Sequence, residues 1–160
     1  MTGQETALPM NTGAEAVETA LKAARKWAYT VKGVQQNQSG IIVCEGTFHG
    51  RTIGIVGFSS EGQYRAGFGP FAPGFKSVPF ADVEALAQVI TPNTAAVLLE
   101  PIQGEGGVHP AEKGYLQAVR KLCDEYGVLL ILDEVQTGFG RTGNLFAYQY
   151  ENITPDLLCL

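Results

Sequence analysis

Apolar positions recur along this chain with two different spacings, which separate the predicted helices from the predicted strands. Where apolar residues return every three or four positions, an amphipathic helix is expected. This spacing predicts helices over residues 14–31, 81–90 and 114–127. Thr12 or Asn11 can cap the first helix, and Gly127 stands where the last should end.

Other segments are apolar without a break, as in strands that are buried on both faces of a sheet. They cover residues 40–45, 77–80, 95–100, 128–133 and 155–160. Strands that alternate with helices predict an α/β fold of three layers, in which helices flank a mostly parallel sheet. Residues 59–75 are rich in Gly, Pro and aromatics without periodicity, which favours a long ordered loop or a subunit contact.

Composition and charge narrow the possible partners. A net charge of -5 does not favour binding to nucleic acid or to an anionic membrane, unless basic residues cluster locally. The nearest approach to a cluster has the spacing of a solvated helix face: Lys22, Arg25, Lys26 and Lys32. No apolar run approaches the length of a membrane span.

The three cysteines, Cys44, Cys123 and Cys159, lie far apart in predicted strands and a helix. No pair has the spacing of metal ligands, so we expect buried reduced thiols, a reducing compartment and no metal site. The first eleven residues have neither the charged start nor the apolar run of a signal peptide.

Asp133 ends the predicted strand 128–133, at the edge of a parallel sheet where ligands bind. A magnesium-nucleotide site would use this carboxylate, but it also needs a phosphate loop ending in Gly-Lys-Ser or Gly-Lys-Thr, which the chain lacks. The glycines of residues 138–143 match a dinucleotide-binding pattern only weakly, because no strongly periodic helix opens there.

The third candidate ligand is pyridoxal phosphate, whose ring nitrogen is kept protonated by a buried carboxylate. Gly13 and Ala14 open a predicted helix, where free N–H groups and the helix dipole favour a phosphate. Phe48 offers a stacking face and Arg51 a two-pronged contact for a substrate carboxylate. Each residue alone has an ordinary structural explanation, so it is their order along successive strands that favours a site.

Four segments carry a resemblance that covers nearly the whole chain: MNTGAEAVETALKAARKW, GTFHGRTIG, EPIQGEGGV and LDEVQTGFGRTG. Together they resemble the class III pyridoxal-phosphate aminotransferases of fold type I. Within this family, GFGPFAPGF and the segment around the first helix are most similar to the ornithine aminotransferases. The implied reaction transfers the δ-amino group of ornithine to 2-oxoglutarate, and acetylornithine aminotransferase is the alternative.

The resemblance implies a role for each matching residue. Those implied to bind the cofactor are Gly13 and Ala14 (phosphate), Phe48 and Val135 (the two ring faces), Asp133 (ring nitrogen) and Gln136 (phenolic oxygen). Those implied on the substrate side are Arg51 (α-carboxylate), His49, Glu100 and Glu105. Glu105 is further implied to mask an arginine that reads the distal carboxylate of the second substrate.

The family's Schiff-base lysine follows the strand that residues 155–160 match, and none of the six lysines of this chain fits that place. We therefore expect residues 1–160 to be the central part of the cofactor-binding large domain, and to be inactive alone. The N-terminal segment, the lysine region and the small domain would be absent. The resemblance implies a homodimer at full length, in the cytoplasm, or in the mitochondrial matrix if a presequence preceded this segment.

Overall fold

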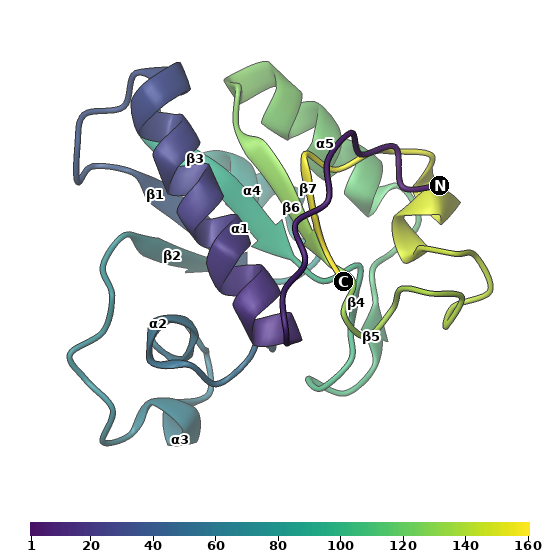
Figure 1. Cartoon of the computed structure of the whole chain (residues 1–160), viewed down its shortest axis with the longest axis horizontal. Helices are drawn as coiled ribbons and strands as arrows, with labels where there is room; N and C mark the ends of the chain where they lie inside the picture. Colours follow the sequence, from purple (N-terminus) through teal and green to yellow (C-terminus); the bar gives the residue numbers. More distant parts are fainter.

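A five-stranded parallel sheet forms the centre of the molecule (Figure 1), and the computed structural model describes all of residues 1–160. In the order in which they lie, the strands are β2 (Phe75–Val78), β1 (Gly40–Cys44), β3 (Thr94–Leu99), β6 (Leu129–Asp133) and β7 (Leu157–Cys159). All neighbours in this sheet are parallel. A separate antiparallel pair, β4 (Ile102–Gln103) and β5 (His109–Pro110), follows β3.

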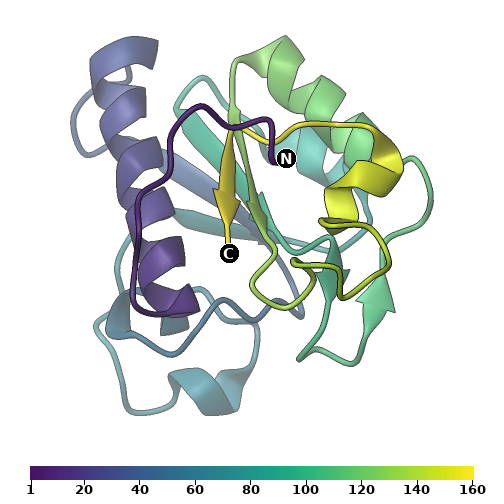
Figure 2. The same ribbon diagram turned by 45° about the vertical axis from the view of Figure 1, so that its right-hand side comes forward.

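Helices cover both faces of the sheet, which confirms the predicted three-layer α/β fold (Figures 1 and 2). One face carries α1 (Gly13–Trp27) with its continuation η1 (Ala28–Lys32), and the other carries α4 (Val83–Val89) and α5 (Tyr115–Tyr126). Three short helices lie in the connections: α2 (Ile53–Val56), α3 (Gly62–Arg65) and η2 (Ala147–Glu151).

Strand β3 shows why the strands read as unbroken apolar runs. All six of its residues are buried. Val97 and Leu99 pack in the core on the α4 and α5 side, whereas Ala96 and Leu98 pack in the core under α1. Successive side chains of a strand point to opposite faces, so a strand covered on both faces has no polar positions to alternate with apolar ones.

The first helix begins as predicted but ends differently. The Thr12 hydroxyl accepts a hydrogen bond from the Glu15 N–H at 3.1 Å, which confirms Thr12 as the N-cap. The α-helix ends at Trp27, and a π-helical turn continues it to Lys32, where Gly33 adopts a left-handed conformation. Apolar periodicity does not distinguish these two kinds of turn, so the sequence predicted one helix.

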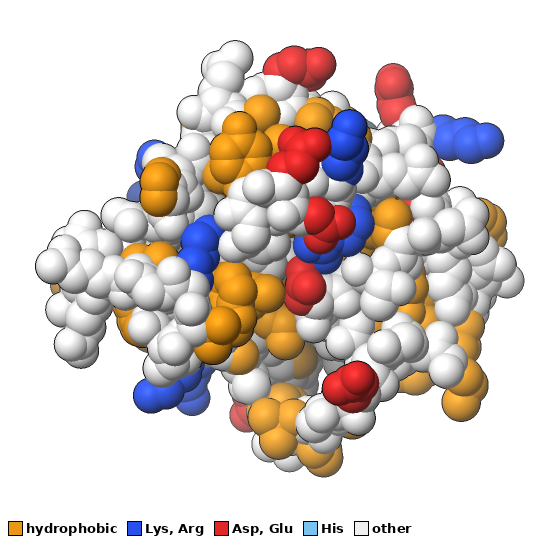
Figure 3. All heavy atoms as spheres, turned by 90° about the horizontal axis from the view of Figure 1, so that it is seen from above, with side chains coloured by type: hydrophobic (Ala, Val, Ile, Leu, Met, Phe, Trp, Pro, Cys, Tyr) orange, Lys and Arg blue, Asp and Glu red, His pale blue; other side chains and the backbone are white.

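Two of the four basic residues assigned to a solvated helix face are not simply solvated. Arg25 donates to the Pro73 carbonyl and lies over the Phe75 ring, 5.1 Å from its centroid. Lys32 donates to the Thr94 carbonyl at 2.7 Å. On the face drawn in Figure 3, acidic and basic side chains are interspersed and neither gathers into a large patch.

Two further sequence expectations need correction. The strand predicted at 77–80 lies at 75–78, because it pairs with β1 in the register Ile41↔Phe75 to Cys44↔Val78. The segment 59–75 is not a loop throughout, since it contains α3 and enters β2 at its end. The expected buried thiols are confirmed, and burial raises the pKa of Cys44, Cys123 and Cys159 to about 12.

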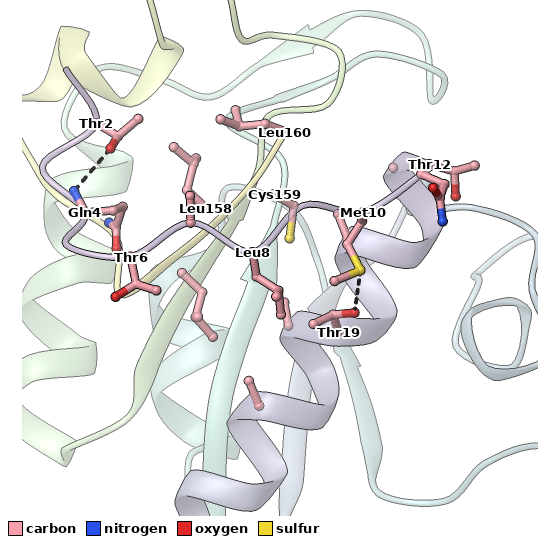
Figure 4. A pocket seen from close by; sticks show the side chains of 17 residues that line it. Thr2, Gln4, Thr6, Leu8, Met10, Thr12, Thr19, Leu158, Cys159 and Leu160 are labelled. Carbon is pink, nitrogen blue, oxygen red and sulfur yellow. Dashed lines mark hydrogen bonds between the residues drawn. The ribbon is translucent and has the colours of Figure 1, made fainter.

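The N-terminal segment runs alongside β7 in both ribbon views (Figures 1 and 2). Gln4 donates to the Pro155 carbonyl at 2.7 Å, and the Tyr148 hydroxyl donates to the Thr2 carbonyl at 2.7 Å. A groove of about 460 Å³ lies between this segment, α1 and β7 (Figure 4). Its lining side chains are uncharged, and Gly13 at the start of α1 is among the lining residues. No helix of the structure has both the length and the apolar character to cross a bilayer.

Candidate active site

Asp133 ends β6, where its carboxylate is held in one orientation. Its side chain is 6% exposed. One oxygen, Oδ2, lies 2.7 Å from Nδ1 of His49, and the other, Oδ1, accepts the Val135 N–H at 3.1 Å. Each carboxylate oxygen can accept a further hydrogen bond. Asp133 can therefore accept a hydrogen bond from a further donor at the carboxyl edge of the sheet.

A second buried carboxylate, Glu100, follows β3 and is connected to the first through two side chains. Nε2 of His49 lies 2.6 Å from Oγ1 of Thr47, and the Thr47 hydroxyl donates to Oε2 of Glu100 at 3.0 Å. The Phe48 N–H donates to the same oxygen at 2.9 Å. Burial raises the pKa of Glu100, and the hydrogen bond from Phe48 opposes this rise. Residues after β1, β3 and β6 thus form one hydrogen-bonded unit.

The start of α1 packs directly against the segments that follow β1 and β6. A Cβ atom on Gly13 would lie 2.7 Å from Cγ1 of Val135, and one on Gly50 would lie 2.8 Å from Cβ of Ala14. The N–H groups of Gly13 and Ala14 have no acceptor within the protein. A 15-residue helix with free N–H groups at its start suits an anion such as a phosphate.

The hairpin formed by β4 and β5 lies beside the site cluster, which is the hydrogen-bonded group of Thr47, His49, Glu100 and Asp133. Gly104 leaves space for Gln136, because a Cβ atom there would collide with the Gln136 amide oxygen. Glu105 lies exposed in the same turn. The structure therefore brings the hairpin with Glu105 next to the segment that carries Val135 and Gln136.

The remaining predicted residues lie around this cluster. Phe48 is half-buried, and the guanidinium carbon of the exposed Arg51 lies 6.0 Å from the centre of its ring. The His49 side chain is fully buried and contacts Asp133 from within the protein, which favours a role toward Asp133 over contact with a substrate. The roles assigned by resemblance stay predictions, but the residues lie together.

Two residues in or next to the cluster have no role in the sequence interpretation. Thr47 connects His49 to Glu100, yet a threonine before Phe48 carries no distinctive signal. Glu134 is fully buried, and its carboxylate accepts hydrogen bonds from the backbone of Ala147 and Tyr148 and from the Thr137 hydroxyl. The threonine three positions after Glu134 was the only local sign of this arrangement.

The packing of Gly13 against Val135 gives a direct test of the site's geometry. We expect Gly13→Ala to destabilise residues 1–160 by about 1–3 kcal/mol, as in other overpacked positions, because the new methyl group displaces Val135. Urea unfolding measures this change. Gly62→Ala is the matched control, since Gly62 also begins a helix but has no atom within 4 Å of the place that a new methyl group would take. Equal stability of the two variants would contradict the packing.

Known proteins resemble this chain over its whole length. The sequence profile of the family described as aminotransferase class-III matches residues 1–160. Ornithine aminotransferase of Brevibacillus brevis is 61% identical over 157 residues, which are 98% of this chain and 39% of that protein. Ornithine aminotransferase of Bacillus subtilis is 59% identical over 160 residues, 100% of this chain and 40% of that protein.

Solved structures agree with these sequence relatives. Ornithine aminotransferase from Toxoplasma gondii has a TM-score of 0.92 and 48% identity, over 93% of this chain and 36% of that one. Acetylornithine aminotransferase from Elizabethkingia anophelis has a TM-score of 0.80 and 44% identity, over 98% of this chain and 35% of that one. The chain thus spans about 40% of the length of the curated relatives it matches.

Proposed function

The chain belongs to the class III aminotransferases, and on this premise we propose that it is part of a full-length ornithine aminotransferase. The proposed reaction transfers the δ-amino group of ornithine to 2-oxoglutarate. The observation that carries the choice of substrate is identity: relatives named ornithine aminotransferase are 57–61% identical over 98–100% of this chain. Acetylornithine is the second candidate donor.

The cluster at the carboxyl edge fits pyridoxal phosphate, which when bound supplies an electron sink for the amino transfer. Asp133 would hold the proton on the ring nitrogen through a charge-assisted hydrogen bond. The free N–H groups of Gly13 and Ala14 would bind the phosphate. Phe48 and Val135 would enclose the ring, and Gln136 would donate to its phenolic oxygen.

The exposed residues around the cluster are proposed to bind the substrates. Arg51 would pair with the α-carboxylate of ornithine, since a guanidinium matches a carboxylate with two parallel hydrogen bonds. Glu105, exposed in the β4–β5 turn, would mask an arginine from elsewhere in the full-length protein. Glu100 is buried, so we propose that it acts on the site through Thr47 and Phe48.

Residues 1–160 alone are expected to be inactive, because none of their lysines suits the covalent step. Lys32 donates to the carbonyls of Thr94, at the amino end of β3, and of Tyr126, at the end of α5, so it lies at the edge of the sheet opposite Glu100. The other five are exposed: Lys22, Lys26, Lys76, Lys113 and Lys121. We propose that the required lysine, the homodimer contacts and the small domain lie in the rest of the full-length protein, in the cytoplasm or the mitochondrial matrix.

Steady-state assays on the full-length protein test the choice of donor. With 2-oxoglutarate as acceptor, kcat/KM for ornithine should exceed that for N-acetylornithine by at least about tenfold, which corresponds to about 1.4 kcal/mol of discrimination. Residues 1–160, mixed with an equimolar amount of pyridoxal phosphate and then borohydride, should give no stoichiometric adduct at a single lysine by peptide mass mapping, since exposed lysines react only weakly and without selectivity. A preference for the acetylated donor would overturn the choice of substrate, and a stoichiometric adduct at one lysine would overturn the expectation that no lysine of residues 1–160 suits the covalent step.

A further inference from the structure

The hydrogen bonds behind Asp133 determine where the protons of His49 lie. The Phe48 N–H donates to Oε2 of Glu100 at 2.9 Å and the Gly104 N–H donates to the other oxygen, Oε1, at 3.4 Å, so both oxygens act as acceptors, as in an ionised carboxylate. The Thr47 hydroxyl has one hydrogen, which it donates to Oε2 of Glu100 at 3.0 Å. The Thr47 oxygen therefore turns its lone pairs toward His49.

A lone pair of Thr47 facing Nε2 of His49 at 2.6 Å requires a proton on that nitrogen. The same holds for the other ring nitrogen: Nδ1 lies 2.7 Å from Oδ2 of Asp133, and an ionised carboxylate only accepts. We infer that His49 is a buried imidazolium, and that Thr47 and Glu100 are positioning residues that keep it in this form behind Asp133.

Charge balance supports the imidazolium. Asp133 and Glu100 are both buried, and neither forms an ion pair with a lysine or arginine. An opposite charge close to a buried carboxylate favours its ionised form. His49 lies between the two carboxylates and is the only group in contact with both, directly with one and through Thr47 with the other.

The other groups near this unit do not supply or remove the proton. On β1, Cys44 lies near Glu100, and on β7, Cys159 pairs in register with Asp133. Burial raises the pKa of each thiol to about 12, so both stay neutral at pH 7. The ring of Phe58, 6.2 Å from the His49 ring between centroids, completes the surroundings without a titratable group.

The consequence for catalysis rests on the proposed function. An imidazolium that donates to Oδ2 keeps Asp133 ionised and fixes the direction of its remaining lone pairs. The same cation weakens the electrostatic attraction between Asp133 and a protonated ring nitrogen, because the carboxylate shares its charge between two donors. Glu100 thereby influences the cofactor through Thr47, His49 and Asp133 without touching it.

Nitrogen NMR of residues 1–160 tests the inference without cofactor. The chain has two histidines, His49 and the exposed His109, so ¹⁵N-histidine labelling resolves both rings. At pH 7 both nitrogens of His49 should show shifts of the protonated type. Thr47→Val removes the acceptor, so the Nε2 signal should move to the unprotonated range, whereas Thr47→Ser should restore the wild-type pattern.

Further variants keep the test decisive if Thr47→Val does not fold. Glu100→Gln removes one compensating charge and should move the Nε2 signal in the same direction as Thr47→Val. The matched control is Glu45→Gln, an exposed carboxylate beside the same segment, which should change neither His49 nor His109. An unprotonated nitrogen in wild-type His49 at pH 7, or no response to Thr47→Val and Glu100→Gln, would overturn the inference. Either result leaves the proposed function open to its own assays.

Discussion

Replacing Asp133 with asparagine in the full-length protein is expected to lower kcat/KM by about a hundredfold. The variant keeps the shape of the side chain but loses the negative charge that would hold a proton on the cofactor's ring nitrogen. Hydrogen bonds to a charged group contribute up to about 3 kcal/mol, and this amount corresponds to roughly a factor of 100 in rate. Steady-state kinetics measure the loss, and titration with pyridoxal phosphate should show weaker binding as well.

Asp124→Asn is the matched control for this prediction. Asp124 is an aspartate on α5 whose side chain is 66% exposed and pairs with Arg120 on the same helix. An exposed pair of this kind contributes at most about 1 kcal/mol, so the control should retain wild-type kcat/KM. If Asp133→Asn kept more than a tenth of the wild-type value, Asp133 would not be the partner of the ring nitrogen.

The strands and main helices could be predicted because burial on both faces leaves a strong signal. Strand β3 has six buried residues in succession, and α5 shows its inward positions at Leu116 and Val119. The short helices α2 and α3 span four residues each, too few to show a period. Their form is set by local caps such as Thr52, whose hydroxyl accepts the Ile55 N–H, and by packing.

The site was predictable where a residue type has a distinctive chemistry at a known place in the fold. Asp133 could be assigned because a carboxylate at the end of a buried parallel strand calls for a ligand or a partner. The neighbour on which it depends could not, since the contact with His49 joins residues 84 apart in sequence. Thr47 gains its importance only from the two side chains that the fold brings against it.

Glu134 is another residue whose role could not be predicted from the sequence. Its removal should have the largest effect on stability. We expect Glu134→Ala to destabilise residues 1–160 by about 4 kcal/mol, because each buried donor left without an acceptor costs roughly 1–3 kcal/mol. Three donors lose their acceptor: the N–H groups of Ala147 and Tyr148, at 2.7 and 2.9 Å, and the Thr137 hydroxyl at 3.0 Å. Urea unfolding followed by circular dichroism measures the change.

Two variants separate this role from a general effect of losing a carboxylate. Glu134→Gln keeps one acceptor oxygen and should lie between the wild type and Glu134→Ala. Glu125→Ala removes a glutamate that is 54% exposed, 3.8 Å from Lys121 on the same helix, and should change stability by less than about 0.5 kcal/mol. A Glu134→Ala protein within about 1 kcal/mol of the wild type would mean that water replaces the carboxylate. The segment with Val135 and Gln136 would then be held by its backbone alone, through the bonds from Glu134 N–H to Cys159 and from Gly138 N–H to Glu134.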